Sequence, residues 1–85
     1  MTDNDISIRK QKNNWTYGTI GGFDFEVKHF KNPSEFGIDD GRISKLWISR
    51  RGTYGAVACY DRGWDKLPRF DQEIEVTQLI IDRFN

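Results

Sequence analysis

The stretch that decides the fold is FDFEVKHF, residues 23–30, in which apolar and charged side chains alternate along the chain. One face of this run would carry Phe23, Phe25, Val27 and His29, and the other would carry Asp24, Glu26, Lys28 and Phe30. Successive side chains of a β-strand point to opposite faces, so this period of two predicts a strand with one packed face and one wet face. We therefore expect an antiparallel sheet that is covered on one side only.

Three other runs around this strand complete the predicted sheet. Residues 15–20 hold Trp, Tyr, Thr and Ile, which favour strands, and Gly21-Gly22 then predicts a tight hairpin turn. The four predicted strands cover residues 15–20, 23–30, 43–50 and 54–60. In the third strand, Leu46 and Ile48 are expected on one face, and Ile43, Lys45 and Trp47 on the other.

The period changes after Phe70, where the spacing of apolar residues becomes helical. Val76, Leu79, Ile80 and Phe84 recur at intervals of three and four, which places them on one face of a helix. Asp71 can cap the N-terminus, and Glu73 lies in the first turn, where the helix dipole favours acids. We predict a helix over residues 71–84 that packs on the face of Phe23, Phe25 and Val27. The predicted fold class is α+β, a four-stranded antiparallel sheet with one C-terminal helix.

The length of the chain, 85 residues, predicts a single domain. Three Trp, three Tyr and six Phe can close a core even in so small a domain. Residues 1–13 are polar and predict a flexible N-terminal arm, although Ile6 and Ile8 alternate in a way that allows a short added strand. Residues 14–85 form the predicted compact domain. No apolar run is long enough for a membrane-spanning helix.

Histidine, cysteine and carboxylate residues predict no catalytic or metal site, and we expect neither an enzyme nor a cofactor. His29 is the one histidine, and its apolar neighbours indicate a packed side chain at a strand end. Cys59 is the one cysteine, which excludes an internal disulfide, and it is expected mid-strand as a small apolar residue. The carboxylates of the turns match no calcium-binding loop, so turn formation explains them more simply: Asp39, Asp40, Asp61 and Asp65.

Basic and aromatic residues occur together in the second half of the chain. The net charge is zero, with 13 basic and 13 acidic residues, but residues 42–69 hold an excess of five bases. The candidate partner-binding residues are Arg42, Lys45, Trp47, Arg50, Arg51, Arg62, Trp64 and Lys66. Trp, Tyr and Arg are enriched at the hot spots of protein interfaces. The same combination suits single-stranded nucleic acid, whose bases stack on aromatic rings, although zero net charge counts against that alternative.

Four phrases of the sequence carry a resemblance to a known group of proteins. They are Lys28-His29-Phe30, Ser34-Glu35-Phe36-Gly37-Ile38, Gly41-Arg42-Ile43-Ser44-Lys45-Leu46 and Tyr60-Asp61-Arg62-Gly63-Trp64-Asp65. Over residues 15–68 the chain resembles small uncharacterised proteins from phages, prophages and mobile elements of Gram-positive bacteria. The resemblance implies a viral or mobile-element accessory protein that acts in the cytoplasm of a bacterial host.

Size, charge and this resemblance together suggest a function without catalysis. We expect the protein to bind and occlude a bacterial host protein or nucleoprotein. The sharpest form of this expectation is an inhibitor of a defence system, of the anti-CRISPR kind. The alternative is a single-stranded nucleic-acid-binding module that uses an aromatic and basic surface.

Overall fold

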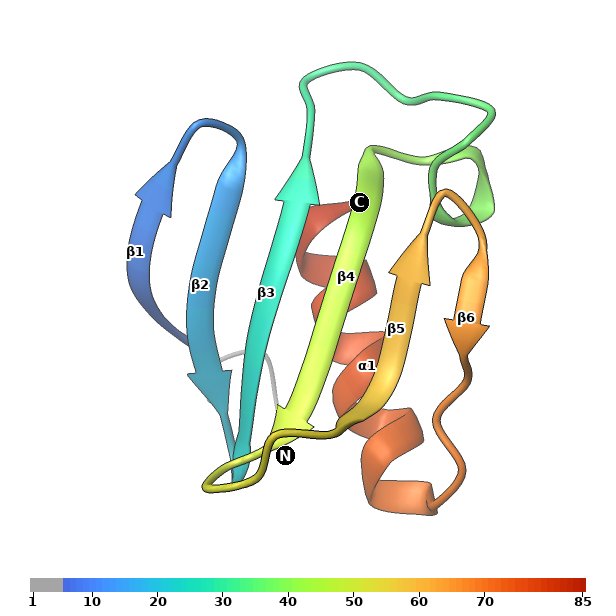
Figure 1. Ribbon diagram of the computed structural model, residues 1–85. Helices are drawn as coiled ribbons and strands as arrows, with labels where there is room; N and C mark the ends of the chain where they lie inside the picture. The colour runs from blue at the N-terminus through green and yellow to red at the C-terminus, as the bar shows by residue number, and fades with distance from the viewer. Residues whose placement is uncertain (1–5) are drawn as a thin grey trace.

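Residues 6–85 are described by the computed structural model, which contains one antiparallel sheet with a helix against one of its faces (Figure 1). The strands follow one another in the sheet in chain order, so that each pairs with the next. They are β1 (Ile6–Lys12), β2 (Trp15–Ile20), β3 (Phe23–His29), β4 (Ile43–Arg50), β5 (Ala56–Asp61) and β6 (Trp64–Lys66). A short 3₁₀ helix (Ile38–Asp40) interrupts the long β3–β4 connection, and α1 (Asp71–Phe84) ends the fold.

The sheet has six strands, so the prediction of four is wrong, although the α+β class and the C-terminal helix are confirmed. One added strand is β1, which occupies residues 6–12 of the expected arm and pairs with β2. Residues 1–5 of that arm lie outside the described residues. Asn13 and Asn14 link the two strands with positive φ angles of 52° and 72°, a conformation that suits a tight hairpin.

The other added strand is β6, a three-residue edge strand that pairs with the end of β5. Arg62 makes this turn possible with a φ of 57°. β5 also begins at Ala56, two residues later than predicted, and Tyr54 before it is 99% exposed. β6 lies outside the predicted strands because the polar residues 61–65 favour a turn and Pro68 follows closely, which disfavours a central strand.

The helix α1 spans residues 71–84 as predicted and packs on the face that carries Phe23, Phe25 and Val27 (Figure 1). These side chains are buried together with Val76 and Ile80 of the helix. Phe25 and Phe84 contact each other with ring centroids 5.9 Å apart. Burial of such large apolar side chains is the main source of stability in a small domain.

Within residues 6–85, no helix packs against the opposite face of the sheet, which we call the open face. Ile43 was expected on this face with Lys45 and Trp47, but that expectation is wrong. The pairing of β3 with β4 shifts register between Lys28 and His29, so that His29 lies opposite Ile43. The extra residue turns the Ile43 side chain into the core, as a β-bulge does. Among the described residues, no helix is long and apolar enough to cross a membrane.

Candidate functional site

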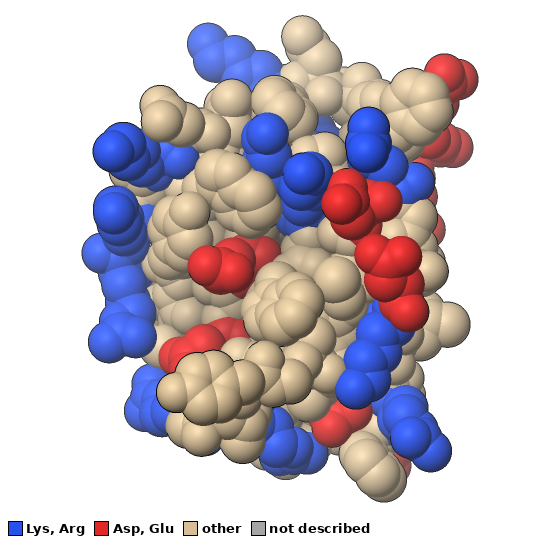
Figure 2. Space-filling model, in the orientation of Figure 1, with Lys and Arg blue, Asp and Glu red and all other residues tan. Residues whose placement is uncertain are grey.

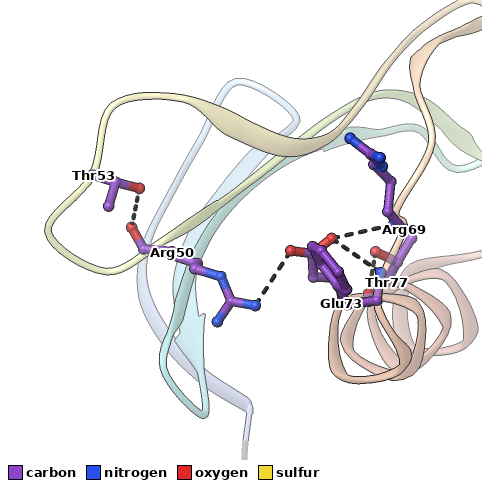
Figure 3. Close-up of polar contacts among 6 residues, drawn as sticks. Arg50, Thr53, Arg69, Glu73 and Thr77 are labelled. Atoms are coloured by element: carbon purple, nitrogen blue, oxygen red, sulfur yellow. Dashed lines mark hydrogen bonds and ion pairs between the residues drawn. The ribbon is translucent and has the colours of Figure 1, made fainter.

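Two of the predicted partner-binding arginines instead hold the two ends of α1. Arg42 donates from Nε to the carbonyl oxygen of Asn85 and from Nη2 to that of Phe84, both at 3.0 Å. Arg50 donates from Nη2 to Oε2 of Glu73 in the first turn of α1, at 3.3 Å (Figure 3). Helix ends carry unpaired backbone groups that need such partners. These contacts assign both side chains a structural role.

The other predicted residues are distributed over separate parts of the surface. Lys45 and Trp47 project from the open face, whereas Trp64 lies on the side of the helix. Arg62 pairs with Asp61 at 3.5 Å in the β5–β6 turn. Arg51 in the β4–β5 turn and Lys66 in β6 are exposed, and within residues 6–85 neither makes an ion pair. The basic and aromatic residues therefore do not form one continuous patch.

One hollow lies between α1, the 3₁₀ helix and the segment after β6, and we call it the helix-side groove. It has a volume of about 260 Å³ and is lined by Ile38, Asp39, Trp64, Leu67, Pro68, Ile74, Thr77, Gln78 and Ile81. Its rim is apolar and accessible, since Leu67 is 60% exposed and Ile74 is 47% exposed. Asp39 is the one charged residue in the lining. This groove can accept an apolar side chain of a partner.

Trp64 is held firmly at this groove. Its ring meets that of Tyr60 edge-on, with centroids 5.1 Å apart. The Tyr60 hydroxyl in turn donates to the carbonyl oxygen of Phe36 at 2.8 Å. Aromatic pairs in this arrangement are favourable, and the chain of contacts orders the indole ring before any partner arrives.

A second hollow lies on the open face, and we call it the open-face hollow. It has a volume of about 270 Å³ and is lined by Trp15, Glu26, Lys45, Leu46, Trp47, Cys59, Tyr60, Asp61 and Asp65. The pairing of β3, β4 and β5 brings its central residues into one row, because Glu26 lies opposite Trp47 and Trp47 lies opposite Cys59. Figure 2 shows this side of the molecule, with basic side chains along the edge over β1 and acidic side chains further in.

His29 and Cys59 do not meet, because they lie on opposite faces of the sheet. The His29 ring lies 5.0 Å from the Phe84 ring on the helix side, and its Nε2 is 2.9 Å from Oγ1 of Thr16. Burial, and then the charge of Arg42, lower the pKa of His29. Burial, and then the charges of Asp65 and Asp61, raise the pKa of the Cys59 thiol in the open-face hollow. Neither environment activates a nucleophile.

Metal ligands are not gathered in the part of the chain that the structure describes. Between residues 6 and 85, no group of three His, Cys, Asp or Glu side chains is arranged to hold an ion. Asp61 is instead shared between two cations, with Lys45 at 3.9 Å and Arg62 at 3.5 Å.

Several residues of the two hollows were not among the sequence-based candidates. Trp15 and Glu26 belong to strands that lie outside the basic segment of residues 42–69. Leu67 lies beside Pro68, and Ile74 falls within the predicted helix of residues 71–84, so neither position indicates an exposed rim. The signal that could have found Trp15 and Glu26 is the strand alternation, which puts them on the uncovered face with Lys28 and Trp47.

Comparison with protein families gives one match. Residues 14–85 match the family model DUF7678, described as a domain of unknown function. The match begins in the β1–β2 turn and covers β2 to β6 and α1. Searches of curated proteins and of solved structures find no match to the chain.

Proposed function

We propose that this chain, which belongs to the DUF7678 family, is a non-enzymatic accessory protein of a phage or mobile element that binds and occludes a bacterial host protein. The observation that carries the proposal is the apolar rim of the helix-side groove. The binding event is expected in the host cytoplasm, the setting that the resemblance to phage and mobile-element proteins implies.

The groove supports protein binding because its exposed apolar side chains are contiguous. Single exposed apolar residues are normal on a protein surface, but several around one hollow mark an interaction site. Leu67 and Ile74 line the groove, and Phe70 between them in sequence is 62% exposed. Trp64 adds an ordered aromatic ring of the kind found at interface hot spots.

Nucleic-acid binding is the weaker alternative. Two lysines on the open face favour it. The Lys28 ammonium lies 5.9 Å from the centre of the Trp15 ring, and Lys45 lies opposite Lys28 on the neighbouring strand β4. Phosphate binding needs unopposed cations, however, and Asp61 lies within 4 Å of Lys45. Arg42 and Arg50 are already engaged with α1.

Inhibition of a defence system, of the anti-CRISPR kind, is the narrower form of the proposal. It is supported by the resemblance to phage and mobile-element proteins and by the small size of the chain. Occlusion needs no catalytic group, because a protein that covers a host surface blocks it by affinity alone.

The test compares capture of host protein by the wild type and by groove variants. Leu67→Asp and Ile74→Asp place a charge in the apolar rim at exposed positions, and Tyr54→Asp is the matched control in the β4–β5 turn. Each purified variant, shown to be folded by circular dichroism, is incubated with lysate of a Gram-positive bacterium, and retained proteins are identified by mass spectrometry.

We expect a host protein that the wild type and Tyr54→Asp retain and that both groove variants lose. Retention that is unchanged by Leu67→Asp and Ile74→Asp would exclude the groove. A fluorescent oligothymidylate that binds in a salt-dependent manner, with no host protein retained, would favour the nucleic-acid alternative.

A further inference from the structure

The open-face hollow has no role in the proposed function, and its lining differs in chemistry from that of the groove. We propose that it is a binding site for the guanidinium group of an arginine side chain presented by a protein partner. The proposal concerns the opposite face of the sheet and does not depend on the groove.

Two indole rings provide the walls of this site. Trp15 lies on β2 and Trp47 on β4, with β3 between them. Two strand spacings separate their backbones by roughly 10 Å, which is enough for a flat group to lie between or beside the rings. Trp47 is 39% exposed. Trp15 is half-buried, and the Tyr17 ring is stacked against it with centroids 6.1 Å apart, so its other face is the one turned to a ligand. Trp is the side chain whose face attracts cations most strongly.

Carboxylates provide the charge that selects a cation. Glu26, Asp61 and Asp65 line the hollow with Lys45 as its one basic residue. Asp61 is engaged by Lys45 and Arg62, whereas within residues 6–85 Glu26 and Asp65 have no ion pair. The hollow therefore has two carboxylates ready to accept hydrogen bonds. Burial, and then the charges of Asp65 and Asp61, raise the pKa of the Cys59 thiol at its centre.

Arginine is the cation that fits both features. Its planar guanidinium stacks on aromatic faces, and its donors form a fork that matches carboxylate oxygens. The ammonium of lysine is compact and strongly hydrated, so it gains less from indole walls. A phosphate group would instead be repelled by Glu26 and Asp65. The Lys28 ammonium lies 5.9 Å from the Trp15 ring centre, so an arginine would compete with it for that indole face.

The test uses N-acetyl-arginine amide as the probe and the indole N–H signals of the three tryptophans as reporters. We expect millimolar probe to shift the signals of Trp15 and Trp47 in a saturable manner and to leave Trp64, on the other side of the sheet, unchanged. N-acetyl-citrulline amide has nearly the same shape without the charge and should shift none of them.

Matched variants identify the carboxylates. Glu26→Gln and Asp65→Asn should each weaken the probe affinity about tenfold, the effect of losing one charge-assisted hydrogen bond. Glu35→Gln makes the same charge change on an exposed part of the β3–β4 loop and should leave the affinity unchanged. Leu67→Asp should also leave it unchanged, so failure of this site and failure of the groove are separately visible.

Three results would overturn the proposal. The first is an absence of shifts at the Trp15 and Trp47 signals with the arginine probe. The second is an equal shift with N-acetyl-citrulline amide or with N-acetyl-lysine amide. The third is an equal probe affinity in Glu26→Gln, Asp65→Asn and Glu35→Gln. Saturable shifts of the same two signals by oligothymidylate, without a response to the arginine probe, would assign the hollow to nucleic acid.

Discussion

Arg50 at the end of β4 forms an ion pair with Glu73 in the first turn of α1, with 3.3 Å between Nη2 of Arg50 and Oε2 of Glu73 (Figure 3). The Glu73 side chain is 6% exposed, and its other oxygen accepts the backbone N–H groups of Arg69 and Phe70. Glu73, and not the predicted Asp71, therefore satisfies donors at the helix N-terminus, where Phe70 is the N-cap residue. One carboxylate both caps α1 and joins it to the sheet.

Reversing the charge at position 50 should destabilise the fold, whereas the same change at position 51 should not. Arg50→Glu removes the ion pair and places a second carboxylate beside buried Glu73, so we expect a loss of about 2–3 kcal/mol. Arg51 is exposed, and Arg51→Glu should change stability by under about 0.5 kcal/mol. Urea unfolding followed by circular dichroism measures both. Equal stability of the two variants would mean that the Arg50–Glu73 contact contributes nothing.

The contribution of Glu73 should disappear in acid. Burial alone would raise its pKa, but hydrogen bonds from the backbone of Arg69 and Phe70, with the charge of Arg50, hold the pKa below 4.5. A carboxyl whose pKa is lower in the folded state stabilises that state fully above 4.5 and loses this effect as the pH falls through the folded pKa.

The measurement compares the free energy of unfolding of the wild type and Glu73→Gln over a range of pH. The difference in unfolding free energy between the two proteins should be constant near neutral pH and should shrink as the pH falls below 4.5. A difference that grows in acid would mean that the folded pKa is raised.

The parts of the fold that were predicted are those in which a single period dominates. Residues 23–29 alternate strictly, and residues 71–84 repeat at helical spacing, so each element is visible without its partners. The sequence predicts an arm at β1 and only allows a short added strand there, because six of its seven residues are exposed, as in an edge strand that is polar on both faces. The shift that buries Ile43 depends on pairing with β3 and leaves no local pattern.

The sequence could not show which charges of the candidate site are already engaged, because contacts between distant residues decide this. Arg42 binds the backbone of Phe84 and Asn85, and Arg50 binds Glu73. Each of these partners is more than twenty positions away in the sequence, so spacing could not identify it. Trp64 is accessible, but it lies on the helix side, away from Trp47.

Phe25 should be among the side chains on which stability depends most. It is fully buried against α1, and Phe25→Ala should cost about 3–5 kcal/mol because it leaves a cavity. Phe36→Ala makes the same change at a side chain that is 58% exposed and should cost under about 1 kcal/mol. Thermal melts of the two variants provide the comparison. A Phe25→Ala protein that melts with the wild type would show that α1 does not pack on this strand.

Asn85 should contribute more to stability than its position after the helix suggests. Its Oδ1 accepts the backbone N–H groups of Arg42 at 2.9 Å and Ile43 at 3.1 Å, and its Nδ2 donates to the carbonyl oxygen of Ile38 at 3.0 Å. One amide thus connects the end of α1 to the 3₁₀ helix and to the start of β4. Gly41 permits this, because a Cβ at that position would collide with the Asn85 side chain.

Replacing that amide should leave the backbone N–H groups of Arg42 and Ile43 without their partner, whereas the Ile38 carbonyl keeps its hydrogen bond from the Gly41 N–H. At about 1 kcal/mol for each hydrogen bond, with water replacing part of the loss, Asn85→Ala should cost about 2 kcal/mol. Asn32→Ala makes the same substitution at an exposed loop position and should change stability by under about 0.5 kcal/mol. Hydrogen exchange provides a local check, since the amides of Arg42 and Ile43 should lose protection in Asn85→Ala and keep it in Asn32→Ala. Equal protection in both variants would mean that the start of β4 is held without the Asn85 side chain.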